Sequence, residues 1–151
     1  MSDTTTTRSA VNDAKISLRE LSDLMVQRVP LVAQLGMVVD AVGAGDTVVR
    51  VPYRGDFVRP GGTVAGPVMM ALADFAMYAV VMSLIGPVEM AVTTNLNINF
   101  LRRPAPGDVT AHGKILKLGK RLAVIDVEIY GGDAKELVAH ATGTYSIPPR
   151  D

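Results

Sequence analysis

A single carboxylate stands in the most apolar stretch of the chain. The run from Gly66 to Ile85 contains one charged residue, Asp74. A helix that is apolar on every side is expected to be buried on every side, and an unpaired buried carboxylate is costly. Asp74 therefore needs a partner, a protonated form or a ligand. Such a carboxylate suits nucleophilic attack or general-base catalysis, and the sequence leaves both roles open.

The residues before Asp74 predict where its helix begins. Gly66 reads as the N-cap and Pro67 as the first helical residue, because the N–H that proline lacks would be unpaired there anyway. A helix N-terminus offers free N–H groups and a positive dipole end, which suit a developing oxyanion. The Gly66 N–H is the expected donor, with Val68 as a second. The same pair of residues is also an ordinary helix start.

Composition excludes several classes of protein. The chain has 151 residues, 48% of them hydrophobic, which suits one domain with one core. Its net charge of zero argues against a nucleic-acid-binding protein. Disulfides and Cys-ligated zinc are excluded because there is no cysteine, and two histidines, His112 and His140, do not predict a metal site. No metal or cofactor is expected.

The polar start of the chain and the apolar run indicate where in the cell the protein is located. Residues 1–14 are polar without an apolar signal core, so they are expected to be a disordered tail before a single domain of residues 15–151. The stretch Val68–Ile85 is near the lower length limit for a membrane span, but Asp74 lies in its middle. A soluble cytoplasmic protein without membrane insertion is expected.

Periodicity predicts an α+β protein in which a curled antiparallel sheet wraps around one long helix. Helical spacing covers residues 17–29, and alternation of apolar and polar residues is typical of the strands. Residues 91–101 alternate most clearly, with one apolar face formed by Val92, Thr94, Leu96, Ile98 and Phe100. The full set of expected strands is 37–42, 47–53, 91–101, 109–117, 122–130 and 137–147, with a turn at 131–133 and the long helix at 66–85.

This order of elements, together with three local motifs, resembles the hotdog fold and the acyl-CoA thioesterases of the phenylacetate-pathway type. The motifs are Gly61–Asp74, then Val92–Pro104 followed by Gly107-Asp108, then Gly119–Val124 with Leu137–Thr144. The resemblance spans residues 35–147. It implies an enzyme that hydrolyses a small acyl-CoA or aryl-CoA thioester, working as a homodimer or a dimer of dimers with its site between subunits.

The resemblance also assigns roles to individual residues. Asp74 matches the catalytic acid, Gly66 the glycine whose N–H receives the thioester carbonyl, and Thr93 a strand position that often carries a hydroxyl. Ala65 stands where the family has a histidine, and Arg59 lies near a position that is often asparagine. Lys120 and Arg121 match a region near the nucleotide end of CoA. The expected substrate contacts are Arg59, Ala65, Val68, Thr94, Arg102, Lys120 and Arg121.

Other interpretations remain open at this point. Because Ala65 replaces the histidine, the chain could bind acyl-CoA without hydrolysing it. A hotdog dehydratase or hydratase would need His112 or His140 close to Asp74 in space. Asp74 could also be a structural acid paired with Arg59 or with a cation of another subunit, in a protein whose role is purely structural.

Overall fold

The computed structural model describes residues 13–132 and 136–150, which form three α-helices, one short 3₁₀ turn and six strands. The helical elements are α2 (Leu18–Arg28), α3 (Pro30–Leu35), η1 (Gly55–Phe57) and α4 (Gly66–Ile85). The strands are β1 (Val38–Gly43), β2 (Asp46–Val51), β3 (Val92–Phe100), β4 (Val109–Leu118), β5 (Leu122–Gly131) and β6 (Glu136–Ser146). The expected tail falls outside the described residues except for Asp13 and Ala14, as does Asp133 of the expected turn.

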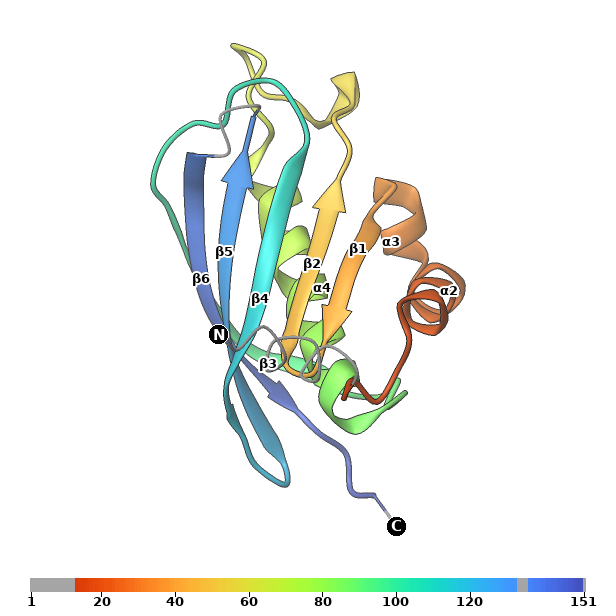
Figure 1. Ribbon diagram of the computed structural model, residues 1–151. Helices are drawn as coiled ribbons and strands as arrows, with labels where there is room; N and C mark the ends of the chain where they lie inside the picture. The colour runs from red at the N-terminus through yellow and green to blue at the C-terminus, as the bar shows by residue number, and fades with distance from the viewer. Residues whose placement is uncertain (1–12, 133–135, 151) are drawn as a thin grey trace, which may run out of the picture.

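All six strands form one antiparallel sheet in the order β1-β2-β4-β5-β6-β3. Figure 1 shows α4 lying against one face of this sheet, with α2 and α3 beside β1 at one edge. The other edge strand is β3, which pairs only with β6 among the described strands. The predicted arrangement, a curled sheet around one long helix, is therefore confirmed.

Local sequence explains where the helices begin and end. Ser17 caps α2 by accepting a hydrogen bond from the Glu20 N–H at 3.1 Å. At the end of α4, Gly86 adopts a positive φ of 86° and its N–H bonds the Met82 carbonyl. The predicted cap at the start of α4 is one residue off: Ala65 is the N-cap and Gly66 is the first helical residue.

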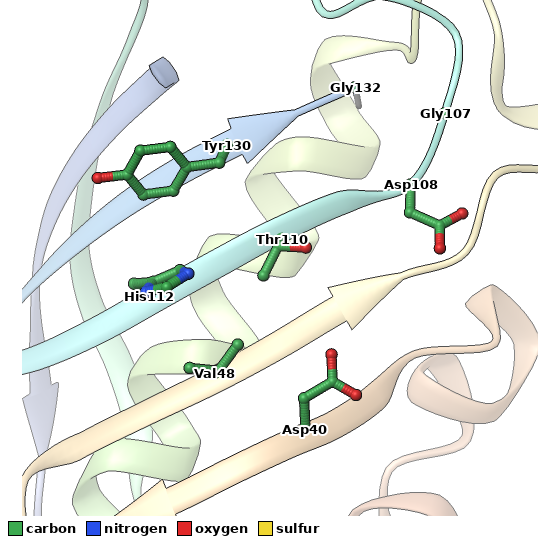
Figure 2. A pocket seen from close by; sticks show the side chains of 8 residues that line it. All are labelled: Asp40, Val48, Gly107, Asp108, Thr110, His112, Tyr130 and Gly132. Atoms are coloured by element: carbon green, nitrogen blue, oxygen red, sulfur yellow. The ribbon is translucent and has the colours of Figure 1, made fainter. Parts of the chain in front are cut away.

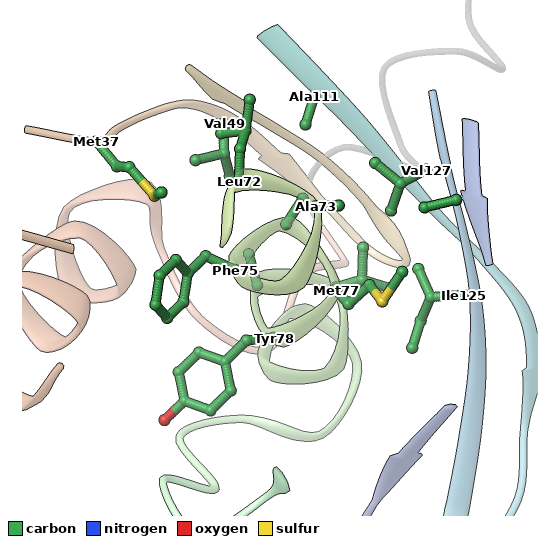
Figure 3. Close-up of a cluster of buried hydrophobic side chains, with 14 of the residues drawn as sticks. Met37, Val49, Leu72, Ala73, Phe75, Met77, Tyr78, Ala111, Ile125 and Val127 are labelled. Carbon is green, nitrogen blue, oxygen red and sulfur yellow. The ribbon is translucent and has the colours of Figure 1, made fainter. Parts of the chain in front are cut away.

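The core lies between α4 and the inner face of the sheet. Figure 3 shows Met77 of α4 beside Ile125 and Val127 of β5, and all three side chains are fully buried. Ile129 joins them, so one face of β5 is fully buried against the helix. By length and composition α4 could cross a membrane, but 67% of its apolar window is buried inside the fold, as in the core helix of a globular domain.

Strand β3 differs from its prediction. Its alternation predicts a buried apolar face, yet Val92 is 56% exposed and Phe100 49% exposed, while Leu96 and Ile98 are only half-buried. Two features explain this: β3 is an edge strand, and an irregularity between Thr93 and Asn95 shifts its register against β6. The apolar side chains of β3 therefore form an open surface beside α4.

Candidate active site

Asp74 lies at the margin between the face of α4 that packs on the sheet and the side of the helix that is left open. Pro67 and Met70 are exposed on this side, Met70 by 41%, and Asp74 is half-buried. Their spacing of three and four residues places them on one face of the helix. The expectation that α4 is buried on every side is therefore wrong, and the departure occurs where the acid stands.

Two hydroxyl groups hold the Asp74 carboxylate. Thr93 Oγ1 of β3 donates to Oδ1 at 2.5 Å, and Tyr145 OH of β6 donates to the same oxygen at 2.8 Å. Tyr145 OH also lies 3.0 Å from the main-chain carbonyl of Asp74. Oδ2 has no hydrogen bond within the described part of the chain, so one carboxylate oxygen is held and the other is open.

Tyr145 is the site residue that sequence reasoning missed. It lies directly opposite Thr93 in the β3–β6 register, and only this pairing brings both hydroxyls to one carboxylate. The sequence contains a weaker indication that Tyr145 faces inward. It stands two residues after Gly143 and four after Ala141, on the same face of β6 as these inward-facing residues. A buried tyrosine hydroxyl needs a hydrogen-bond acceptor, and Asp74 supplies it.

The environment keeps Tyr145 protonated. Burial raises the pKa of the Tyr145 phenol, and the negative charge of Asp74 raises it further. Burial also raises the pKa of Tyr78, whose ring centroid lies 6.2 Å from that of Tyr145 and whose hydroxyl donates to the Glu89 carbonyl. Tyr145 thus remains a hydrogen-bond donor to the carboxylate across the neutral pH range.

A cavity of about 500 Å³ opens at the N-terminus of α4. Gly66 lines it, and the Gly66 N–H makes no backbone hydrogen bond within residues 13–132 and 136–150. The Val68 N–H, the expected second donor, donates to the Ala65 carbonyl at 3.1 Å in this structure. The other lining residues are Arg59, Thr63, Val64, Pro67, Met69, Phe100, Leu101, Arg102, Arg103 and Pro104.

The remaining predicted contacts are divided between the two ends of the molecule. Arg59 and Arg102 line the cavity, and Ala65 directly precedes it in the chain. Thr94 bonds the Thr144 carbonyl at 3.1 Å. Lys120 and Arg121 lie in the β4–β5 turn, and Figure 1 places that turn at the opposite end of the fold from the start of α4.

Two of the open interpretations call for contacts that are not observed within the described part of this one chain. Asp74 has no ion pair within the described residues, so the expected alternative of pairing with Arg59 is not observed in the chain. His140 Nε2 lies 2.6 Å from Asp126, and His112 packs edge-on against Tyr130. Both imidazoles thus have partners other than the carboxylate that a dehydratase would need beside them.

The outer face of the sheet carries a second cavity, of about 760 Å³ (Figure 2). Asp40, Asp108, His112 and Tyr130 line it. Arg50 joins the two acids, at 2.9 Å from Asp40 and 3.2 Å from Asp108, and Tyr130 OH bonds Glu128. The two acids and Tyr130 thus already have hydrogen-bonding partners on this open surface. The smaller cavity, beside a free helix N–H, fits a reacting carbonyl better.

Solved structures of known proteins resemble the whole fold. A provisionally named thioesterase from Silicibacter sp. TM1040 superposes with a TM-score of 0.82 and is 37% identical over 90% of this chain and 94% of its own. A variant of the phenylacetic acid degradation protein PaaI from Thermus thermophilus gives a TM-score of 0.70 at 30% identity, over 79% of this chain and 99% of its own.

Sequence comparison leads to the same family. A protein of Saccharolobus solfataricus with a provisional esterase name is 33% identical over 103 residues, 68% of this chain and 72% of that protein. The model of the thioesterase superfamily matches residues 61–138, which include the start of α4, Asp74 and Thr93. The chain is therefore a hotdog-fold member of the thioesterase superfamily, and its class of activity is thioester hydrolysis.

Proposed function

We propose that this protein hydrolyses a small acyl-CoA or aryl-CoA thioester, with Asp74 as its reactive group. The observation that carries the proposal is the Asp74 carboxylate itself, which lies at the margin of the open side of α4 with Oδ1 held by two hydroxyls and Oδ2 free. A fixed carboxylate with one free oxygen is suited to attack a thioester carbonyl or to take a proton from an attacking water.

Both routes lead to the same products. As a nucleophile, Asp74 attacks the thioester carbon, the carbon–sulfur bond breaks with CoA leaving as the thiolate, and water then hydrolyses the acyl anhydride. As a general base, Asp74 takes a proton from water while the water oxygen attacks that carbon; the carbon–sulfur bond then breaks, and CoA leaves as the thiolate and takes up the proton. In either case negative charge develops on the carbonyl oxygen, and the free Gly66 N–H at the dipole end of α4 is the proposed donor to it.

The spacing along α4 favours a site shared between two chains. Asp74 follows Gly66 by eight residues, which separates their backbones by about 12 Å at about 1.5 Å per residue. An attacking atom approaches a carbonyl carbon to roughly 3–3.5 Å, so one thioester cannot meet both groups of one helix. We propose that Gly66 of one chain serves the same thioester as Asp74 of its partner in a homodimer.

The open edge of the sheet supports this homodimer. Val92 and Phe100 of β3 and the adjoining Leu101 are each about half exposed, and Met70 of α4 is exposed beside Asp74. An uncovered edge strand with apolar side chains is prone to pair with another chain. Pairing two β3 strands antiparallel would cover these side chains and place the start of α4 near Asp74 of the partner. A dimer of dimers is a further step of the same proposal.

Cations at both ends of the fold are placed to bind the anionic part of CoA. Arg59 and Arg102 line the cavity at the start of α4. In an antiparallel dimer, the β4–β5 turn of the partner, with Lys120 and Arg121, approaches that same end. We propose that these four side chains contact the CoA phosphates, for which arginine and lysine are suited donors.

The experiment that tests the proposal measures CoA release from a panel of acyl-CoA and aryl-CoA thioesters by the wild type, Asp74→Ala and Asp74→Asn. We expect turnover by the wild type and loss of about a thousandfold or more in both variants, with the fold and oligomeric state unchanged. If the wild type binds an acyl-CoA but releases no CoA, the protein is an acyl-CoA-binding protein. Full activity in Asp74→Asn would exclude Asp74 as the reactive group.

A further inference from the structure

We infer that Tyr145 is the residue that positions the Asp74 carboxylate, leaving Oδ2 as the oxygen that acts on the thioester. This inference rests on the proposed function and adds to it. It is carried by the placement of the Tyr145 hydroxyl, 2.8 Å from Oδ1 and 3.0 Å from the main-chain carbonyl of the same aspartate.

The contact with the main-chain carbonyl ties the phenol to the helix itself. That carbonyl belongs to the rigid backbone of α4, and Tyr145 is only 3% exposed beneath it, so the hydroxyl has a fixed position relative to the helix axis. The phenol has one hydrogen, which it directs to Oδ1 or shares between the two oxygens. The Tyr145 hydroxyl therefore holds the carboxylate in one rotamer, and the position of this hydroxyl does not change when the carboxylate rotates.

Thr93 and Tyr145 both donate a hydrogen bond to Oδ1, but they lie on strands with different surroundings. Thr93 lies on an exposed position of the edge strand β3, which within the described chain pairs only with β6. Tyr145 lies on β6, which is paired on both sides, with β5 and with β3. Because both donors use Oδ1, Oδ2 keeps its lone pairs for water or for the thioester carbon. The more deeply anchored donor therefore decides where Oδ2 points.

The neighbouring titratable groups, Tyr78 and Glu89, have partners other than the Asp74 carboxylate. Tyr78 of α4 donates to the Glu89 carbonyl, and Glu89 itself forms an ion pair with Arg28. Tyr78 therefore offers a matched control: it is a buried tyrosine next to Tyr145, and its hydroxyl does not contact the carboxylate.

The test compares Tyr145→Phe with Tyr78→Phe. For Tyr145→Phe we expect kcat for the best thioester substrate to fall by ten- to a hundredfold while KM stays within about twofold, because a misplaced reactive group slows the chemical step and leaves binding intact. Tyr78→Phe is expected to keep both constants within about twofold. Thermal unfolding of both variants measures the cost of losing one buried hydroxyl. An unchanged kcat in Tyr145→Phe would overturn the inference.

A second readout needs no turnover. In protein labelled with 3-fluorotyrosine, the ¹⁹F resonance that disappears in Tyr145→Phe reports on Tyr145. Replacing its anionic acceptor in Asp74→Asn should shift this resonance more than that of Tyr78. If it does not move, Tyr145 does not hold the carboxylate and the inference is overturned. If it moves while the wild type releases no CoA from any thioester, the contact stands and the proposed hydrolysis fails.

Discussion

At the scale of single residues, Thr93 supplies one of the two hydroxyls that hold Asp74, from an exposed position on an edge strand. We expect Thr93→Val, which keeps the side-chain shape but removes the donor to Oδ1, to lower kcat by about tenfold, or about 1.4 kcal/mol in activation free energy. Thr93→Ser keeps the hydroxyl and should retain most of the activity. Steady-state kinetics of the two variants provide the check, and equal loss in both would show that the methyl group matters and the hydroxyl does not.

The buried phenol of Tyr145 also makes a prediction about alkaline stability. Its pKa is raised in the folded protein by burial and by the Asp74 charge, whereas in the unfolded chain the phenol ionises near pH 10. Above that pH the unfolded state binds fewer protons than the native state, so the free energy of unfolding falls as pH rises. Stability gained from the protonated phenol is complete below pH 10 and is lost above it.

Removing the phenol should therefore make the protein less sensitive to alkali. In Tyr145→Phe, the slope of the unfolding free energy against pH above pH 10 should be shallower by about 1.4 kcal/mol per pH unit. Urea unfolding at a series of pH values measures this slope. Tyr53→Phe, which removes an exposed tyrosine, should keep the wild-type slope. An unchanged slope in Tyr145→Phe would mean that the phenol also ionises in the folded protein.

How far the site could be predicted from the sequence depends on the range of the interactions. Asp74 and Gly66 lie eight residues apart on one helix, so a local pattern is enough to propose both as site residues. Tyr145 lies 71 positions after Asp74, and only the register of β3 against β6 connects them. Such a register is fixed by packing over the whole sheet, which a single sequence does not specify locally.

At the scale of elements, the close approach of α4 to the sheet depends on glycines beneath the helix. A Cβ added at Gly113 of β4 would lie 2.9 Å from Val80 Cγ2 and 3.2 Å from the Ala76 carbonyl oxygen, both on α4. We expect Gly113→Ala to lower the free energy of unfolding by about 1–3 kcal/mol, because a stiff side chain and the helix backbone must both move. Chemical denaturation measures this loss.

A control for this prediction lies in the loop before α4. Nothing stands within 4 Å of a Cβ at Gly55, so Gly55→Ala should change the free energy of unfolding by less than about 0.5 kcal/mol. If Gly113→Ala were equally neutral, the helix would be less tightly fitted to the sheet than its contacts indicate.

The elements themselves were largely predictable, and the exceptions have one cause. Helix α2 and strand β5 follow their patterns because the inward residues of each, such as Leu21 and Ile125, are covered within the single chain. The patterns of α4 and β3 predicted burial that the single chain does not provide, at Met70 and at Val92. Both departures from the predicted burial concern the surface that α4 and β3 leave open. The apolar residues there are explained by the proposal that another chain covers this surface.

At the scale of the whole molecule, the proposed shared site can be tested by mixing two inactive chains. Asp74→Asn removes the reactive group, and Gly66→Pro removes the N–H; because this places a second proline before Pro67 at the start of α4, circular dichroism and the oligomeric state must show that the variant still folds and dimerises. Each variant alone should be inactive. A heterodimer purified through two different tags should recover about half of the wild-type activity, because one of its two sites then contains Gly66 and Asp74 intact, contributed by different chains. A heterodimer of Asp74→Asn with the wild type sets the expected level. If the mixed dimer is as inactive as its parents, both groups act within one chain, and the helix spacing of about 12 Å would have to be bridged by some other donor to the thioester carbonyl.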